Sequence, residues 1–293
     1  MTAHTISSSG VARRLLGWSL RDLRQQSRLN VKAAAVALEW SEPKLWRIET
    51  GQTTVRGLDV EAMCAVYGAP PGLAQDLAGL ARPARTEGWW HPHGDAVPGA
   101  FDVYARLEEH ACQVQGYEPS QIPALLRTEP YASALITSSH PNAGTQETDE
   151  LVHECTARQV LLTRARTPLA VTLILGEAVL RCPTGGAQVM AGQLRHLAKL
   201  AVLPNVHLQV VPFTAGMHPG LRAGPFALLR FPYHGPEPDE ATVHVPGLTG
   251  ELYLDTPQEV QQYEAAYATI SSSALDEPRT RDLLLTAARE LEQ

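Results

Sequence analysis

A proline- and glycine-rich stretch divides the chain and limits what it can fold into. Residues 83–100 contain three prolines and three glycines in 18 positions, a composition that interrupts both helical and strand patterns. We expect a connector here, after a domain at residues 13–82 with a flexible N-terminus at 1–12. A second domain is expected at residues 101–293, because 293 residues suffice for two domains.

The region before the connector has the apolar spacing of short helices. Leucine, isoleucine, valine and alanine recur there at three- and four-residue intervals, which predicts five short helices in an all-α module. The expected inward-facing residues are Leu16, Leu20, Leu23, Ala34, Ala37, Leu38, Leu45, Ile48, Val60, Met63, Tyr67, Leu73, Leu77 and Leu80.

The region after the connector mixes both patterns and predicts a larger α+β domain with a small antiparallel sheet. Helices are expected at 104–114, 129–137, 145–164 and 187–203, and strands at 169–175, 206–213, 226–231 and 242–245, with 251–254 as a fifth candidate. Thr256, Pro257 and Glu259 form a capping box for a helix that runs to about residue 274. Pro278 begins the last helix.

Charge is distributed unevenly between the two regions. Residues 1–70 carry nine basic and six acidic side chains, whereas the remaining residues carry 15 basic and 25 acidic ones. A basic face on one small module is expected of a protein that contacts nucleic-acid phosphates, and an acidic remainder argues against binding by the whole surface. No apolar run approaches the ~20 residues of a membrane helix. The four cysteines include no CxxC pair, so we expect a reduced, cytoplasmic protein that does not bind membranes.

The most informative segment is residues 30–51, NVKAAAVALEWSEPKLWRIETG. Asn30 is placed to cap a short helix of good helix formers, and a tight turn follows at residues 39–41. Ser41 is placed to cap a second helix whose Leu45 and Ile48 face inward. A helix, a short turn and a second helix form the geometry that lays the second helix in a DNA major groove.

This segment resembles the helix-turn-helix of the Xre/Cro family of phage-repressor-like regulators. In that family the second helix commonly ends in an Arg-Ile-Glu-x-Gly run, matched here by residues 47–51. The resemblance implies an ion pair between Arg24 and Glu49 that holds the second helix in place. Asn30 and Val31 stand where members often have a Thr-Gln pair, and Glu39 stands where a turn glycine is usual.

Groove geometry assigns the expected contacts. Residues near the start of the second helix reach base edges, which makes Glu42, Lys44 and Arg47 the candidates for base contact. Trp40 and Trp46 are expected to pack in the core or between domains rather than on DNA. The candidates for contact with the DNA backbone are Asn30, Lys32, Gln52, Thr53, Thr54 and Arg56.

From Gly88 onward the chain resembles the C-terminal domain of the Scr1-type, WhiJ-like regulators of actinomycetes. The matching stretches lie at residues 88–91, 117–132, 177–200, 205–220, 224–231 and 247–255. The resemblance implies an antitoxin-like transcription factor with a small partner protein encoded beside it.

No enzyme motif accompanies these features: GxSxG, HExxH, a P-loop, GxGxxG and paired CxxC are all missing from the sequence. His153 and Glu154 begin like a zinc motif but lack its second histidine. We therefore expect no catalytic residues, metal or cofactor. His218 and Gly220 lie in a glycine-rich loop that is either a small-molecule site or a structural connection between strands.

Two functions follow from the sequence. The first is a sequence-specific transcriptional regulator that binds an inverted repeat in double-stranded DNA as a homodimer, with its C-terminal domain controlled by a small protein partner or a ligand. The alternative is an antitoxin-like protein-interaction module with weak or vestigial DNA binding.

Overall fold

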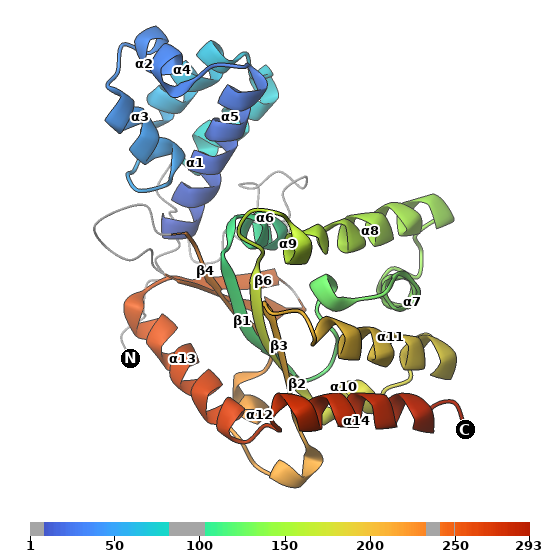
Figure 1. Cartoon of the computed structure of the whole chain (residues 1–293). Coiled ribbons are helices and arrows are strands. Elements are labelled where there is room, and N and C mark those ends of the chain that lie inside the picture. Colours follow the sequence, from blue (N-terminus) through green and yellow to red (C-terminus); the bar gives the residue numbers. More distant parts are fainter. Residues whose placement is uncertain (1–8, 82–102, 233–240, 249) are drawn as a thin grey trace. The chain divides into compact units, whose positions relative to one another are not determined.

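The computed structural model describes residues 9–81, 103–232, 241–248 and 250–293 (Figure 1). The chain forms two compact units, one from residues 1–107 and 233–259 and the other from residues 108–232 and 260–293. The predicted connector at residues 83–100 lies outside the described residues. The segment at 233–259 was predicted to be part of the second domain, so the division into units does not follow the order of the sequence.

The first unit begins with the five predicted helices. They are α1 (Ser9–Gln26), α2 (Val31–Ala37), α3 (Glu42–Glu49), α4 (Gly57–Tyr67) and α5 (Pro71–Leu80). Helix α1 begins at Ser9, so the described part of the predicted flexible N-terminus, residues 9–12, is helical. Val11 is fully buried, which explains why the helix extends this far.

The five helices share one apolar core, and the predicted helical faces are nearly all correct. Two predicted positions differ: Ala37 is exposed, and Leu73 is only partly buried at the edge of the core. The buried members are Leu16, Leu20, Leu23, Ala34, Ala35, Leu38, Leu45, Ile48, Val60, Met63, Cys64, Tyr67, Leu77, Ala78 and Leu80.

The same unit contains an antiparallel hairpin from late in the sequence, β5 (Thr242–Gly247) and β6 (Gly250–Leu254). The first half of α1 contacts this hairpin region. The Nη1 atom of Arg14 donates to Oγ1 of Thr242 at 3.0 Å. A Cβ atom on Gly10 would lie 2.3 Å from Oδ2 of Asp255, so a larger residue there would displace the Asp255 carboxylate. Helix α1 therefore belongs both to the five-helix core and to the hairpin region.

The second unit contains a sheet with the strand order β3-β2-β1-β4. Its strands are β1 (Gln113–Glu118), β2 (Ala170–Gly176), β3 (Val206–Val211) and β4 (Phe226–Arg230). Strands β1, β2 and β3 are parallel, and only β4 runs antiparallel to β1. The α+β prediction is confirmed, but the sheet is mixed rather than antiparallel throughout, because helices connect β1 to β2 and β2 to β3, as parallel pairing requires.

Strand β1 is the largest departure from the predicted elements. A helix was expected over residues 104–114, but α6 (Val103–His110) ends earlier and the chain continues as a strand. Gly116 lets β1 approach β4 closely, because a Cβ atom at this position would lie 2.6 Å from the backbone oxygen of Phe226. The strand is positioned by partners far along the chain, so its own residues give little sign of it.

Helices follow each strand of the second unit. They are α7 (Glu129–Ser139), α8 (Thr145–Ala157), α9 (Val160–Thr163), α10 (Glu177–Arg181), α11 (Ala187–Leu200), α12 (Gly220–Ala223), α13 (Pro257–Ser272), which begins in the first unit, and α14 (Glu277–Glu290), with short 3-10 turns at Ala124–Leu126 and Phe213–Ala215. Helices α11 and α14 lie side by side (Figure 1). The N-cap half of the predicted capping box is present, since the Thr256 hydroxyl accepts from the backbone N–H of Glu259 at 3.4 Å. The Glu259 carboxylate accepts from the same hydroxyl, whereas a capping box has it accept from the backbone N–H of the N-cap residue. Among the described helices, none has the length and apolarity of a membrane span.

Candidate nucleic-acid interface

Helices α2 and α3 and the turn between them form a helix-turn-helix, and both predicted caps are present. Oδ1 of Asn30 accepts from the N–H of Ala33 at 2.8 Å, and Oγ of Ser41 accepts from the N–H of Lys44 at 3.4 Å. In the turn, Glu39 has a φ of 56°. This left-handed conformation normally favours glycine, so the turn glycine implied by the family resemblance would suit this position.

Helix α3 has two distinct faces. Leu45, Ile48 and Glu49 are buried. Glu42, Pro43, Trp46 and Arg47 are exposed and form its outer face. Nε of Arg47 donates to the carbonyl oxygen of Pro43 at 3.3 Å, which aligns the guanidinium along this face. Two of the three predicted base-contact residues, Glu42 and Arg47, therefore lie where a DNA groove could reach them.

The third predicted base-contact residue is arranged differently. The ammonium group of Lys44 lies 3.5 Å from the ring centroid of Trp40, a cation–π contact that holds the side chain against the turn. Trp40 is itself partly buried against the core, as predicted. The structure thus leaves Arg47 as the basic side chain on the outer face of α3.

The predicted backbone-contact residues surround α3 in sequence. Lys32 and Asn30 are exposed at the start of α2, and Thr54 and Arg56 are exposed in the loop after α3. Gln52 and Thr53 are partly exposed in the same loop. These positions suit contacts to phosphates on either side of a groove.

A buried ion pair fixes the inner face of α3. Nε and Nη2 of Arg24 contact the two carboxylate oxygens of Glu49 at 2.7 and 2.8 Å, and both side chains are buried. Nη1 of Arg24 donates to the carbonyl oxygen of Leu29 at 2.8 Å. The hydrogen bond to Glu49 raises the pKa of Arg24. The pair implied by the family resemblance is therefore present, in a geometry far stronger than that of an exposed surface pair.

Tyr67 of α4 completes this network, and no sequence motif indicated it. Its hydroxyl donates to Oε1 of Glu49 at 3.2 Å. Burial, together with the adjacent carboxylate, raises the pKa of Tyr67, so the hydroxyl keeps its proton and remains a donor. Three helices, α1, α3 and α4, thus meet at one carboxylate.

Helix α3 also packs against α1 at very short range. A Cβ atom on Gly17 would lie 2.4 Å from the backbone oxygen of Ile48. Gly51, which ends α3, has a φ of 71°, and a Cβ atom there would lie 2.8 Å from Cα of Arg14. Nε of Arg13 donates to the carbonyl oxygen of Gly51 at 2.5 Å. These contacts leave α3 little freedom to move relative to α1.

Trp46 is the residue that the sequence analysis placed wrongly. It was expected to pack in the core or between domains, but it is 40% exposed on the outer face of α3. The error is one of helical phase, because Leu45 and Ile48 occupy the inward positions on either side of it.

Two family models match different parts of the chain. A helix-turn-helix domain model matches residues 15–77, and a model described as a domain of unknown function (DUF5753) matches residues 101–286. The chain belongs to the DUF5753 family. Its N-terminal module is a helix-turn-helix domain, which suggests DNA binding. Neither a curated protein nor a solved structure matches the chain.

Within the DUF5753 domain, packing accounts for His218 and Gly220. The His218 ring meets the buried ring of Tyr117 edge-on at 5.8 Å, and its Nδ1 accepts from the N–H of Gly220 at 3.2 Å. A Cβ atom on Gly220 would lie 2.7 Å from both rings. Of the two interpretations of this loop, these contacts favour a structural connection between strands rather than a small-molecule site.

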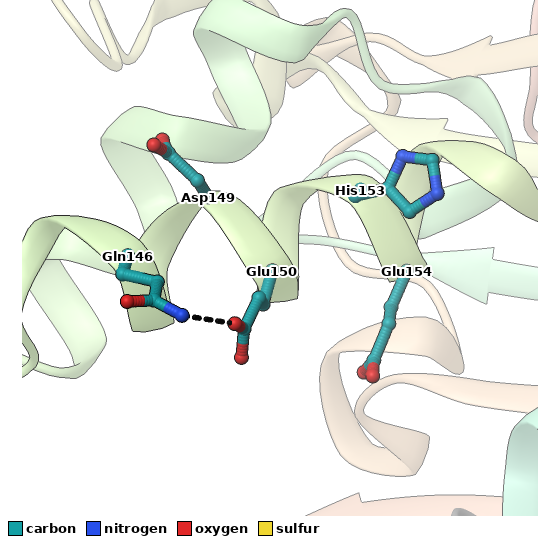
Figure 2. Close-up of a pocket in the computed structure, with 5 residues that line it drawn as sticks. All are labelled: Gln146, Asp149, Glu150, His153 and Glu154. Carbon is teal, nitrogen blue, oxygen red and sulfur yellow. Dashed lines mark hydrogen bonds between the residues drawn. The ribbon is translucent and has the colours of Figure 1, made fainter.

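One face of α8 in the DUF5753 domain is hollowed and acidic. It is lined by Gln146, Asp149, Glu150, His153 and Glu154 (Figure 2). Nε2 of Gln146 donates to Glu150 at 3.0 Å, whereas Asp149 points away from Glu150 and Glu154 (Figure 2). The described residues contain no group of three or more metal-binding side chains. The face is a solvated acidic surface, without convergent chemistry.

Glu118, at the carboxyl end of β1, is an unusual titratable group that sequence reasoning missed. Its Oε2 atom is buried and has no hydrogen-bond partner among the described residues. Burial raises its pKa to about 7, against the opposing effect of nearby Arg127. A carboxyl group with this pKa changes its charge near neutral pH.

We expect the stability of the DUF5753 domain to fall as the pH rises through 7. Folding raises the pKa of Glu118 from its ordinary value of about 4.5 to about 7. The protonated carboxyl group therefore contributes fully to the unfolding free energy below about pH 4.5. This contribution is lost as the pH rises through about 7. The loss amounts to about 3 kcal/mol. Urea unfolding followed by far-UV circular dichroism at pH 5 and pH 8 measures it. The Glu118→Gln variant should lose most of this difference, and an unchanged difference would contradict the assignment.

Proposed function

We propose that this protein is a sequence-specific, DNA-binding transcriptional regulator of the Xre/Cro type that acts in the cytoplasm and has no catalytic activity. The observation that carries the proposal is the construction of α3. Its inner face is fixed by the Arg24–Glu49 pair, and its outer face presents Glu42 and Arg47 to the solvent. A rigid helix with charged side chains on its open face suits direct reading of base edges.

The acidity of the DUF5753 domain supports separate functions for the two parts of the chain. Its surface charge repels DNA, which confines DNA contact to the basic module. We propose that this domain dimerises the protein and receives a signal from a small partner protein or a ligand. A homodimer would bind an inverted repeat whose half-sites lie about one helical turn apart.

A second candidate, an antitoxin-like interaction module with weak DNA binding, is favoured by one observation. Lys44 contacts Trp40, so the outer face of α3 carries fewer available cations than the sequence predicted. A steep salt dependence of binding to a defined duplex would count against this candidate, because counterion release follows phosphate contacts.

Enrichment of random duplex DNA by the purified full chain tests the first proposal. At two salt concentrations, we expect recovery of a palindromic site. Arg47→Ala should weaken binding to this site by about 1–3 kcal/mol and relax the base preference at one position in each half-site.

Two further variants separate the contributions to binding. Lys32→Ala should weaken binding equally on the enriched site and on random DNA, because a phosphate contact has no base preference. Arg281→Ala, an exposed arginine of the DUF5753 domain, should change neither affinity. Equal losses on cognate and random DNA for Arg47→Ala would refute a base-reading role for Arg47.

A further inference from the structure

The outer face of α3 contains an apolar surface that its charged residues do not explain. Trp46 is 40% exposed, and Pro43, three residues earlier and thus on the same side of the helix, is also exposed. Arg47 adjoins Pro43, since its Nε donates to the Pro43 carbonyl oxygen at 3.3 Å. The surface that faces outward is therefore apolar at its centre, with Glu42 and Arg47 beside it.

The contrast with Trp40 shows that this exposure is specific to one of the two tryptophans. Trp40 packs against the core and receives the Lys44 ammonium group on its ring. Trp46 belongs to the same short segment but lies outside the buried positions of α3, Leu45 and Ile48. Because Lys44 is held at the turn, Trp46 and Arg47 are the two large side chains that remain on the outer face.

The last turn of α3 fixes the backbone from which the Trp46 side chain projects. The Thr50 hydroxyl donates to the carbonyl oxygen of Trp46 at 2.8 Å, and the residues on either side of the tryptophan are anchored by Leu45 in the core and by the Arg47–Pro43 contact. A tryptophan has only two side-chain torsions, so it loses little conformational entropy on binding. It is a rigid apolar probe on the helix face that we assign to the groove.

The major groove offers an apolar side chain one kind of base-edge partner. Its base edges present hydrogen-bond donors and acceptors, with the C5-methyl group of thymine as the apolar exception. We propose that Trp46 specifies thymine by contacting this methyl group, at a base pair next to the one read by Arg47. This inference rests on the proposed function. It adds a base preference that the charged residues of α3 do not supply.

Replacement of thymine by deoxyuridine tests the contact, because it removes the methyl group and leaves base pairing unchanged. In the site enriched by the full chain, thymines are replaced one position at a time. We expect about fourfold weaker binding for one position in each half-site, the effect of one methyl group. Exchange of that T·A pair for C·G should weaken binding further, and 5-methylcytosine in place of the cytosine should recover part of the loss.

The variant Trp46→Ser ties the effect to the side chain. It should bind the thymine and deoxyuridine duplexes equally, while Trp46→Phe should retain part of the preference. Because Trp46 lies outside the core, both variants should keep the wild-type circular dichroism spectrum. Equal sensitivity of wild type and Trp46→Ser to deoxyuridine would overturn the proposal. So would a uniform loss of affinity on all sequences for Trp46→Ser, which indicates a sugar or phosphate contact instead.

The two levels of inference fail in different ways. If the wild-type chain enriches no sequence, the proposed regulator function fails, and the thymine contact fails with it. If the chain enriches a site that depends on Arg47 but is indifferent to deoxyuridine at every position, the regulator function stands and only the role of Trp46 is wrong.

Discussion

Glu49→Gln is expected to lower the unfolding free energy of the helix-turn-helix module by about 3–5 kcal/mol. The substitution keeps the size of the side chain but removes its charge, so the buried guanidinium of Arg24 loses the carboxylate that contacts it through two nitrogens. The Tyr67 hydroxyl also loses a charged acceptor. Removing one partner of a buried pair is costly because the other charge remains buried without compensation.

Tryptophan fluorescence during urea unfolding measures this effect selectively. All five tryptophans lie between residues 18 and 90, so their emission reports on the N-terminal region of the chain. Glu42→Gln provides the matched control. It makes the same chemical change on the same helix, but at an exposed position, and should shift the unfolding free energy by less than about 0.5 kcal/mol. Equal effects for the two variants would show that the buried pair adds nothing to stability.

Gly17→Ala is expected to force α1 and α3 apart. The added Cβ would lie 2.4 Å from the backbone oxygen of Ile48 and 2.9 Å from the backbone nitrogen of Gly51. Backbone atoms cannot rotate away as a side chain does, so the helices must shift. We expect a loss of about 1–3 kcal/mol in unfolding free energy. The variant should also bind the enriched DNA site more weakly, because the shift moves the outer face of α3.

Gly79→Ala in α5 makes the same change where there is room for it. Nothing lies within 4 Å of a Cβ atom at that position, so this variant should be unchanged or up to about 1 kcal/mol more stable. Fluorescence-monitored unfolding and duplex binding are compared for the two variants. A Gly17→Ala protein with the stability and DNA affinity of Gly79→Ala would mean that the α1–α3 contact tolerates a methyl group.

Local chemistry made much of the first unit predictable. The caps at Asn30 and Ser41 and the apolar spacing of the five helices depend on residues that are close in sequence, and the structure contains them. The ion pair between Arg24 and Glu49 followed from a family resemblance. Its burial, and the part played by Tyr67, depend on how three helices pack, which no local pattern records.

The errors share a physical origin in contacts between distant segments. Strand β1 pairs with residues 170–175 and 226–230, and its sequence, QVQGYE, has a single β-branched residue, Val114, among polar residues and a glycine, which is a weak signal for an isolated strand. Because β1 was read as the end of a helix, no strand preceded β2 across a helical connection. The parallel pairing of these strands was therefore missed. The burial of Glu118 depends in the same way on tertiary packing, whereas the exposure of Trp46 follows from the helical phase of α3.

The hydrogen bond from Arg14 to Thr242 limits where the chain can be divided into fragments that fold on their own. A fragment that ended after α5 would contain every residue matched by the helix-turn-helix model. It would nevertheless lack Thr242 and Asp255, which contact the first half of α1 from a segment more than 200 residues away. The helix-turn-helix module is thus not an independent unit that recombination could transfer intact to another C-terminal domain. An exchange of this module would also require a matching change in the β5–β6 hairpin region. We therefore expect the sequences of α1 and of this region to have changed together during evolution.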